Sequence, residues 1–311
     1  MFITQNKTIF FAVAGGLAAL ALVAILSFGL KFGIEFTGGS TFEVRYETER
    51  PAQERVEGVI APLFDRSVSV RPAGDSSYII QTPFVQDDEH SEVMEQLSFG
   101  GELEVIEERF SSVGPSIGEE LRAKALVAIA LVVTGIVLFV AFSFRRGMDT
   151  EGNYLNEGVS SWYYSLAAIV ALIFDILIPT GLFALLGVAL GAEVDVLFVT
   201  ALLAIIGFSV NDTIVVFDRV RENLQVNRET NHKENFDETV GKSLTQSFAR
   251  SINTSLTTSL VLIALYVFGG AVTQAFALTL LVGVLAGTYS SLFIASPLLV
   301  KFQEWGEKRN S

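Results

Sequence analysis

The stretch VDVLFVTALLAIIGFSVNDTIVVF, residues 194–217, is long enough and apolar enough to cross a lipid bilayer as a helix. A helix needs about 20 mostly apolar residues to span the hydrocarbon core. Other runs of this kind lie on both sides of it, so we expect six transmembrane helices in all. The other five runs are residues 9–30, 125–142, 163–190, 252–268 and 276–300.

Composition favours a membrane protein over a soluble one. Half of the residues are apolar and only 18% are charged, whereas soluble domains carry about 25% charged residues. The first apolar run is too long for a typical signal peptide, and residues 27–31 lack a small-residue cleavage site. We therefore interpret it as a retained membrane anchor.

The orientation follows from the Lys and Arg residues, which concentrate in cytoplasmic loops. They flank the second, fourth, fifth and last runs, at Arg145, Arg146, Arg219, Arg221, Arg228, Lys233, Lys242, Arg250, Lys301, Lys308 and Arg309. The connections 191–193 and 269–274 contain none. Both termini are therefore predicted to be cytoplasmic. The predicted parts are 1–30 (N-terminus and first helix), 31–120 (extracytoplasmic domain), 121–300 (helices two to six) and 301–311 (cytoplasmic tail).

The segment outside the membrane shows short alternating elements in place of long apolar runs. Its pattern predicts strands at 41–47, 67–71, 78–82 and 102–111, helices at 52–61 and 87–97, and a turn at 72–75. The order β-α-β-β-α-β is that of a ferredoxin-like split unit. The expected fold class is an α-helical polytopic membrane protein with one small α+β extracytoplasmic domain.

Several classes of function are excluded or disfavoured by residue type. Residues 31–120 hold 19 Asp and Glu against 7 Lys and Arg, without a basic cluster, so no nucleic acid is expected to bind. The chain has no Cys, and its two His, His90 and His232, stand alone, so neither a metal site nor a cofactor is expected. No nucleophile and base pair suggests an enzyme.

The most informative residue is Asp212, inside the quoted stretch. It precedes Arg219 by seven residues, which places it about 10 Å inside that end of the helix. Ionisable residues within a membrane are costly and are usually functional. A bare carboxylate at that depth favours its protonated form, which suits a proton carrier.

A polar face on the fifth predicted helix is the natural partner of Asp212. Its residues recur at i, i+3, i+4, i+7 and i+8 and are Arg250, Asn253, Thr254, Thr257 and Thr258. This face should look into protein or water, and with Asn211 it would form a polar track. Asp212 and Arg250 could pair at similar depth on antiparallel helices. A switchable ion pair and a static pair within ordinary helix packing both remain open.

Two further sites stand out. Asp175 lies twelve residues into the third run, about 18 Å along its helix, and either joins the relay or hydrogen-bonds a neighbouring helix. A glycine-rich loop follows the first run, with Gly33, Glu35, Phe36, Thr37, Gly38 and Gly39. It lacks the Lys and the helix of a phosphate-binding loop, so we expect glycines that allow tight turns where the chain leaves the membrane.

These same segments resemble the SecF branch of the SecD/SecF family, within the RND-like transporter superfamily. The loop 33–39 is similar to the family marker G-[IV]-D-F-T-G-G, with Glu35 in place of Asp. Further similarity lies in residues 209–213 and 217–223, 250–258 and 287–297. Together the motifs cover nearly the whole chain.

The resemblance implies a subunit that pairs with SecD as a heterodimer in the bacterial inner membrane. It would use the proton gradient to assist the late passage of SecA-driven preproteins through SecYEG, with YajC and YidC as further candidate partners. By motif, Asp212 and Arg250 correspond to family residues tied to proton conduction, and Asp175 fits a third position. A scaffold that stabilises the translocon and a proton-coupled exporter of small hydrophobic molecules are the alternatives.

Overall fold

The structure is a computed structural model, and it describes residues 6–47, 49–64, 68–144, 161–230 and 234–310. The sequence-based topology relied in part on Arg145, Arg146 and Lys233, which lie outside the described residues, as does His232. The structure divides into two compact units. One comprises the described residues of 1–31, 128–192 and 197–311, and the other those of 32–127 and 193–196.

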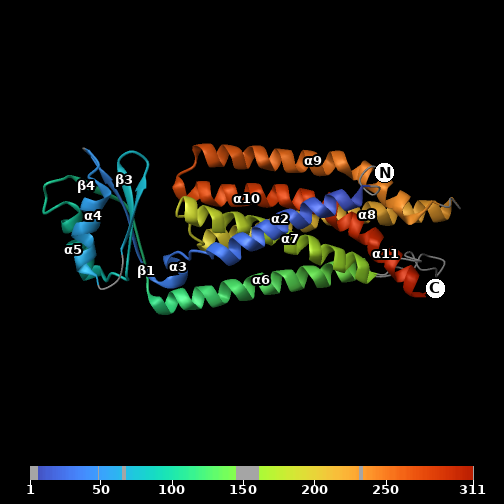
Figure 1. The fold of residues 1–311 in the computed structure, drawn as a ribbon, viewed down its shortest axis with the longest axis horizontal. Helices are drawn as coiled ribbons and strands as arrows, with labels where there is room; N and C mark the ends of the chain where they lie inside the picture. Colours follow the sequence, from blue (N-terminus) through green and yellow to red (C-terminus); the bar gives the residue numbers. More distant parts are fainter. Residues whose placement is uncertain (1–5, 48, 65–67, 145–160, 231–233, 311) are drawn as a thin grey trace. The chain divides into compact units, whose positions relative to one another are not determined.

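Within the described residues, six helices are long and apolar enough to cross a membrane, which confirms the predicted number (Figure 1). The last of them is interrupted by a wide π-helical turn, η2. The spans are α2 (Lys7–Phe28), α6 (Pro115–Ser143), α7 (Ser161–Ala189), α8 (Val196–Glu229), α9 (Phe236–Phe268), and α10 (Ala271–Ser290) continued by η2 (Ser291–Ala295) and α11 (Ser296–Asn310).

Two of these helices are much longer than their apolar runs. Helix α8 continues to Glu229 and does not end near Phe217, and α9 begins at Phe236, well before Ile252. The extra turns are polar, so a search for apolar runs cannot find them. The start of α9 is fixed locally, because Asn235 and Glu238 form a reciprocal capping box that satisfies free backbone N–H groups.

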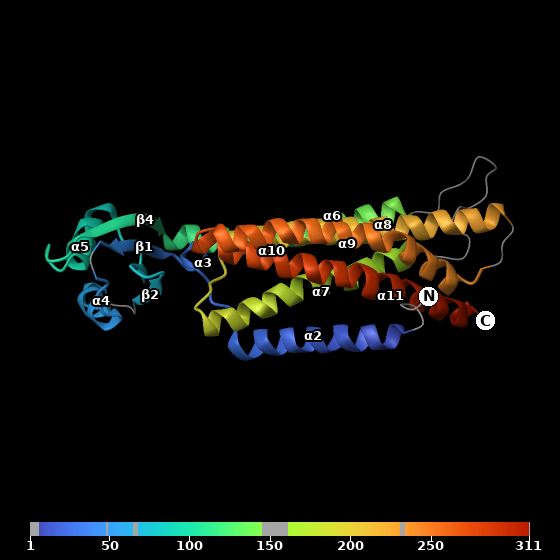
Figure 2. The same cartoon turned by 90° about the horizontal axis from the view of Figure 1, so that it is seen from above.

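The bundle is organised around α7 and α10. Helix α2 packs against α7, and α10 packs against both α7 and α9, as Figures 1 and 2 show. Three aromatic rings pack together in one part of the core. The Phe144 and Tyr164 rings stack with centroids 5.0 Å apart, and the Phe217 ring meets Phe144 edge-on at 5.8 Å. This core holds α6, α7 and α8 together.

The other unit contains an antiparallel sheet with the strand order β2-β3-β1-β4. Its elements follow the predicted order β-α-β-β-α-β. They are β1 (Gly39–Tyr46), α4 (Gln53–Ile60) with the 3-10 turn η1 (Ala61–Leu63), β2 (Ser69–Ala73), β3 (Ser77–Thr82), α5 (Asp87–Leu97) and β4 (Val105–Val113). Buried residues from α4 and α5 pack with those of the strands on one sheet face.

Two boundaries in this domain differ from the prediction. Pro72 and Ala73 were expected in a turn but belong to β2. Because β2 is an edge strand, a proline there removes no ladder hydrogen bond that the sheet needs. Strand β4 begins at Val105, later than the predicted 102, because residues 98–103 form a hydrogen-bonded turn in which Leu103 N donates to Ser98 O.

The glycine-rich loop contains a short helix, α3 (Ile34–Thr37), that the sequence did not predict. Gly38 and Gly39 follow it with φ of 73° and 140°, a region that favours glycine. A Cβ at Gly38 would lie 2.7 Å from Cα of Pro115 at the start of α6. The predicted reason for these glycines, a tight backbone turn, therefore agrees with the structure.

Candidate functional site

A small polar pocket lies between α8, α9 and α10 in the membrane bundle. It holds about 340 Å³ of empty space, including the part at its open mouth. Four residues singled out from the sequence line it: Asn211, Asp212, Thr254 and Thr258. The remaining lining residues are Phe208, Ser209, Ser255, Val284, Gly287 and Thr288. The pocket is therefore the place where the predicted polar track meets Asp212.

Asp212 is half-buried in the wall of this pocket. Two residues of α9 act on the Asp212 carboxyl: Ser251 through its hydroxyl and Arg250 through its positive charge. Within the described chain, however, no salt bridge joins Asp212 to Arg250. The two residues thus lie on neighbouring helices, as expected, in electrostatic reach of each other but not paired.

Asp175 is fully buried on α7, and its carboxyl accepts a hydrogen bond from the Ser209 hydroxyl of α8. Its second oxygen, Oδ1, is buried with no hydrogen-bond partner among the described residues. Ser290 of α10 is close to the same carboxyl, although its hydroxyl donates to Gly287 O at 3.1 Å. The predicted hydrogen bond to a neighbouring helix is therefore present.

Ser209 connects the two carboxylates. It donates to Asp175 and also lines the pocket that contains Asp212. Gly287 allows this arrangement, because a Cβ there would lie 3.0 Å from Cβ of Ser209 and would push α10 away from α8. Asp175, Ser209 and Asp212 thus form a line of polar groups from the buried core to the pocket.

The buried polar face of α9 is not the polar face singled out from the sequence. It consists of Thr239 followed by serines spaced four apart: Ser243, Ser247, Ser251, Ser255 and Ser259. The expected face is largely exposed in this chain, at Asn253, Thr254 and Thr257. Threonine hydroxyls tolerate this exposure because they donate to carbonyls of their own helix; Thr254 donates to Arg250 O at 2.9 Å and Thr257 to Asn253 O at 3.0 Å.

The serine face brings α9 close to α10. Ser255 Oγ and Thr288 Oγ1 lie 2.5 Å apart, and both residues line the pocket. Sequence reasoning missed Ser209, Ser255 and Thr288. A signal for Ser209 existed, because it precedes Asp212 by three residues and so shares its helical face. Contacts of Ser255 with α10 depend on packing between helices, which spacing along one helix cannot give.

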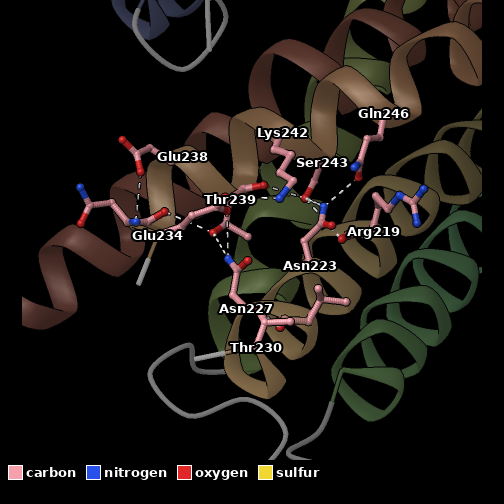
Figure 3. Close-up of polar contacts among 12 residues, drawn as sticks. Arg219, Asn223, Asn227, Thr230, Glu234, Glu238, Thr239, Lys242, Ser243 and Gln246 are labelled. Carbon is pink, nitrogen blue, oxygen red and sulfur yellow. Dashed lines mark hydrogen bonds and ion pairs between the residues drawn. The ribbon is translucent and has the colours of Figure 1, made fainter. Parts of the chain in front are cut away.

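A polar network joins the ends of α8 and α9 beyond the apolar runs (Figure 3). Asn223 Nδ2 lies 2.8 Å from both Ser243 Oγ and Gln246 Oε1. Asn227 Nδ2 donates to Glu234 Oε2 and Thr239 Oγ1, each at 3.0 Å. These contacts fix the register of the two antiparallel helices, and so set which residues of α9 stand opposite Asp212.

The glycine-loop residues belong to the sheet-containing unit and do not line the pocket. Phe36 is buried, and the Thr37 hydroxyl donates to Gly33 O at 3.0 Å. The Glu35 carboxylate accepts the backbone N–H of Val196, the first residue of α8, at 2.6 Å. The sequence did not predict a role for Glu35 at the start of that helix.

Comparison with known proteins gives the family. Residues 159–305 match the family described as "Protein export membrane protein SecD/SecF, C-terminal", and residues 23–49 match the SecD/SecF GG motif. The protein translocase subunit SecF of Anaerolinea thermophila is 36% identical over 99% of this chain and 96% of its own length. The chain belongs to the SecF family. SecF of Thermobaculum terrenum is 40% identical over 90% of this chain and 87% of its own.

Solved SecDF structures share the fold. SecDF from Thermus thermophilus, described as a translocon-associated membrane protein, superposes with a TM-score of 0.81 at 31% identity and covers 98% of this chain. SecDF in a super-membrane-facing form gives a TM-score of 0.67 at 30% identity. This SecF-family chain spans 39% of the length of either SecDF chain. The predicted resemblance and fold class are confirmed: the chain is a multi-pass membrane protein of the protein-export translocase.

Proposed function

We propose that this chain acts with SecD, as a heterodimer, to assist the late movement of SecA-driven preproteins through SecYEG at the expense of the proton gradient. The family relationship supports the place in export, and the intramembrane carboxylates support the coupling to protons. The same proposal puts the chain in the bacterial inner membrane with both termini in the cytoplasm. YajC and YidC are the further partners we would test.

The observation that carries the proton-coupling proposal is the setting of Asp212. The carboxyl is half-buried in a polar pocket and within reach of the Arg250 charge, yet no salt bridge within the described chain holds it. A carboxylate in this setting can take up and release a proton without first breaking a tight contact. Intramembrane ionisable groups that face a cavity are typical of proton pathways.

The proposed cycle follows from the charge on that carboxyl. When Asp212 binds a proton from the outer side, its attraction to Arg250 ends and α8 and α9 are free to shift. Release of the proton to the inner side restores the attraction and the first arrangement. Asp175 serves as a second carboxyl of the relay, linked to the pocket through Ser209. The shift of the helices would then move the outer domains of the two subunits.

The test is translocation of a secretory precursor into vesicles that contain the complete complex, with and without an imposed proton gradient. We expect Asp212→Asn to lose the gain that the gradient gives, while co-purification shows that the complex with SecD still forms. Asp175→Asn should lower the gain with assembly kept, because a carboxamide oxygen still accepts from Ser209. Glu229→Gln, an exposed carboxylate on the same helix, is the matched control and should behave as the wild type.

The contrary outcome is equally informative. If Asp212→Asn keeps the full gain from the gradient, the carboxylate is structural. The chain would then be a scaffold of the translocon, and deletion of the chain, not substitution of Asp212, would impair export.

A further inference from the structure

A charged cluster lies in the sheet-containing unit, which the proposed function makes the outer unit. It is centred on Glu193, in the loop between α7 and α8. Its Oε1 accepts from the guanidinium of Arg71 on β2, and its Oε2 accepts from Gln81 Nε2 on β3 at 2.5 Å. The Arg71 and Glu193 side chains are only 28% and 21% exposed. Two neighbouring strands thus hold one carboxylate of a loop that is more than a hundred residues away in sequence.

This contact uses the sheet face that α4 and α5 leave uncovered. Side chains alternate between the two faces along a strand. Val70 and Ile80 point into the core with the helices, so Arg71 and Gln81, their neighbours in sequence, point to the other face. The loop residue Glu193 is therefore the partner that the structure provides for polar groups of that face.

The glycine-rich loop holds the same segment from the other direction. Phe32 pairs with Val194 as an isolated parallel bridge, and Gly33 N donates to Val194 O at 2.9 Å. The Glu35 carboxylate then accepts from Val196 N. A carboxylate at the first turn of a helix satisfies a free N–H and is favoured by the helix dipole. Residues 193–196 are thereby held on both sides before α8 begins.

An ion pair that is mostly shielded from water is costly to form, and loss of one partner leaves the other charge without compensation. Such contacts fix a geometry more than they add stability. Here the geometry concerns α8, which starts at Val196 and bears Asp212 sixteen residues later, about 24 Å along the same helix. Helix α8 contains no proline and runs without interruption from Val196 to Glu229, so we expect a displacement at its first residue to be carried along its axis.

We propose that Glu193, held by Arg71 and Gln81, and Glu35, bound to the first N–H of α8, form a rigid link that transmits movement between the outer sheet and the helix that bears Asp212. Both are positioning residues, since neither contacts a transported proton. The inference rests on the proposed function, because that proposal gives α8 its movement.

The experiment uses the complete complex in vesicles and compares the gradient-dependent gain in translocation among matched variants. We expect Glu193→Ala to reduce that gain about 5-fold or more, the range typical of coupling between linked sites, with gradient-independent translocation unchanged. Glu108→Ala is the matched control, because it breaks the 2.7 Å Arg45–Glu108 ion pair of the same sheet without touching the loop. It should keep the full gain.

The charge-swapped double variant Arg71→Glu with Glu193→Arg separates a specific link from general damage. The pair is restored with reversed sign, and the amide oxygen of Gln81 can accept from the introduced guanidinium. We expect most of the gain to return, and this variant decides the matter if Glu193→Ala fails to assemble with SecD. Glu35→Ala should lower the gain and Glu35→Asp should keep most of it, because Asp also accepts from an N-terminal N–H.

Two results would overturn the link: full gain in Glu193→Ala, or a loss that the charge-swapped pair does not restore. Asp212→Asn in the same vesicles tests the proposed function separately. If Asp212→Asn retains the gain, proton coupling through Asp212 fails whatever Glu193 does. If Asp212→Asn loses the gain while Glu193→Ala keeps it, only the link is wrong.

Discussion

Both the sheet-containing unit and the membrane bundle bury large apolar side chains, such as Phe42 in the first and Phe217 in the second, but among the described residues only the bundle buries a carboxyl group, that of Asp175, and a row of serines, on α9. Conversely, the bundle leaves large apolar residues such as Leu138 and Phe142 well exposed, at 64% and 71%. In water, removal of apolar surface stabilises the fold. In a lipid environment that driving force between helices is absent, so close fit and polar contacts hold the helices together.

The two units should therefore respond to different kinds of substitution. A cavity should be most costly in the sheet-containing unit, while an added methyl group should be most costly where two membrane helices approach through glycine. The two carboxyls of the proposed relay, Asp175 and Asp212, both lie within the spans, where an ionisable group is costly.

The largest effect is expected for Phe42→Ala in the sheet-containing unit. Phe42 is fully buried, and its ring lies 4.7 Å from that of Phe110. Its truncation should lower the free energy of unfolding of this domain by about 3–5 kcal/mol. Denaturant unfolding of the purified protein, followed by near-UV circular dichroism, measures the loss. Phe84→Ala removes a 42% exposed ring and is the control; equal losses in both variants would contradict the buried core.

A smaller effect is expected in the bundle for Gly283→Ala on α10. A Cβ at this position would overlap the buried side chain of Ile205 on α8. Overpacking of this kind should destabilise the bundle by about 1–3 kcal/mol, seen as a lower melting temperature in detergent. Gly207→Ala on α8 is the control, because a Cβ there meets no described atom within 4 Å. If both alanines were tolerated equally, α8 and α10 would not be in close contact at Gly283.

The smallest effect concerns a polar group in the apolar core of the sheet-containing unit. Burial, and next the nearby Tyr78, raise the pKa of Tyr46 from its usual 10 to about 12. The neutral form of Tyr46 is thus favoured in the folded protein. The stability that this preference gives is fully present below pH 10 and is lost as the pH rises from 10 to 12. Tyr46→Phe should lack that dependence and also lose the hydrogen bond to Leu97 O, at about 0.5–1.5 kcal/mol.

The measurement for Tyr46 is the unfolding free energy of both proteins between pH 9 and pH 12, the range that brackets the two pKa values. Only the difference between wild type and variant is used, because lysines and other tyrosines titrate in the same range. A constant difference across that range would mean that Tyr46 ionises as easily in the fold as in the unfolded chain.

Much of the fold follows from local sequence. The apolar runs predict all six spans, because nothing else places about 20 apolar residues in a row. Alternation and turn residues predict the order of elements in the sheet-containing unit. What fails is the extent of α8 and α9, since their outer turns are polar and are held by side-chain contacts such as Asn223 with Ser243.

The site is only partly visible in sequence. Asp212, Asp175 and Arg250 stand out because charge inside a span is rare. The serines of α9 do not, because Ser in a membrane helix is common and its partner lies on another helix. Glu193 and Arg71 are 122 residues apart in the chain, and only the fold of the sheet brings them together.

The π-helical turn η2 sets which face of α11 meets the core. Such a turn holds one residue more than an α-helical turn, so it offsets the phase of everything that follows. Leu299 and Val300 of α11 are buried with that offset, while Lys301 is exposed. If this turn became α-helical with all five residues kept, α11 would rotate by up to about 100°, and this would change which of these side chains meets the core. Deletion of one residue from 291–295 would instead let an α-helical turn take its place and keep the orientation of α11, so a substitution that removes the π turn should do more damage than a one-residue deletion.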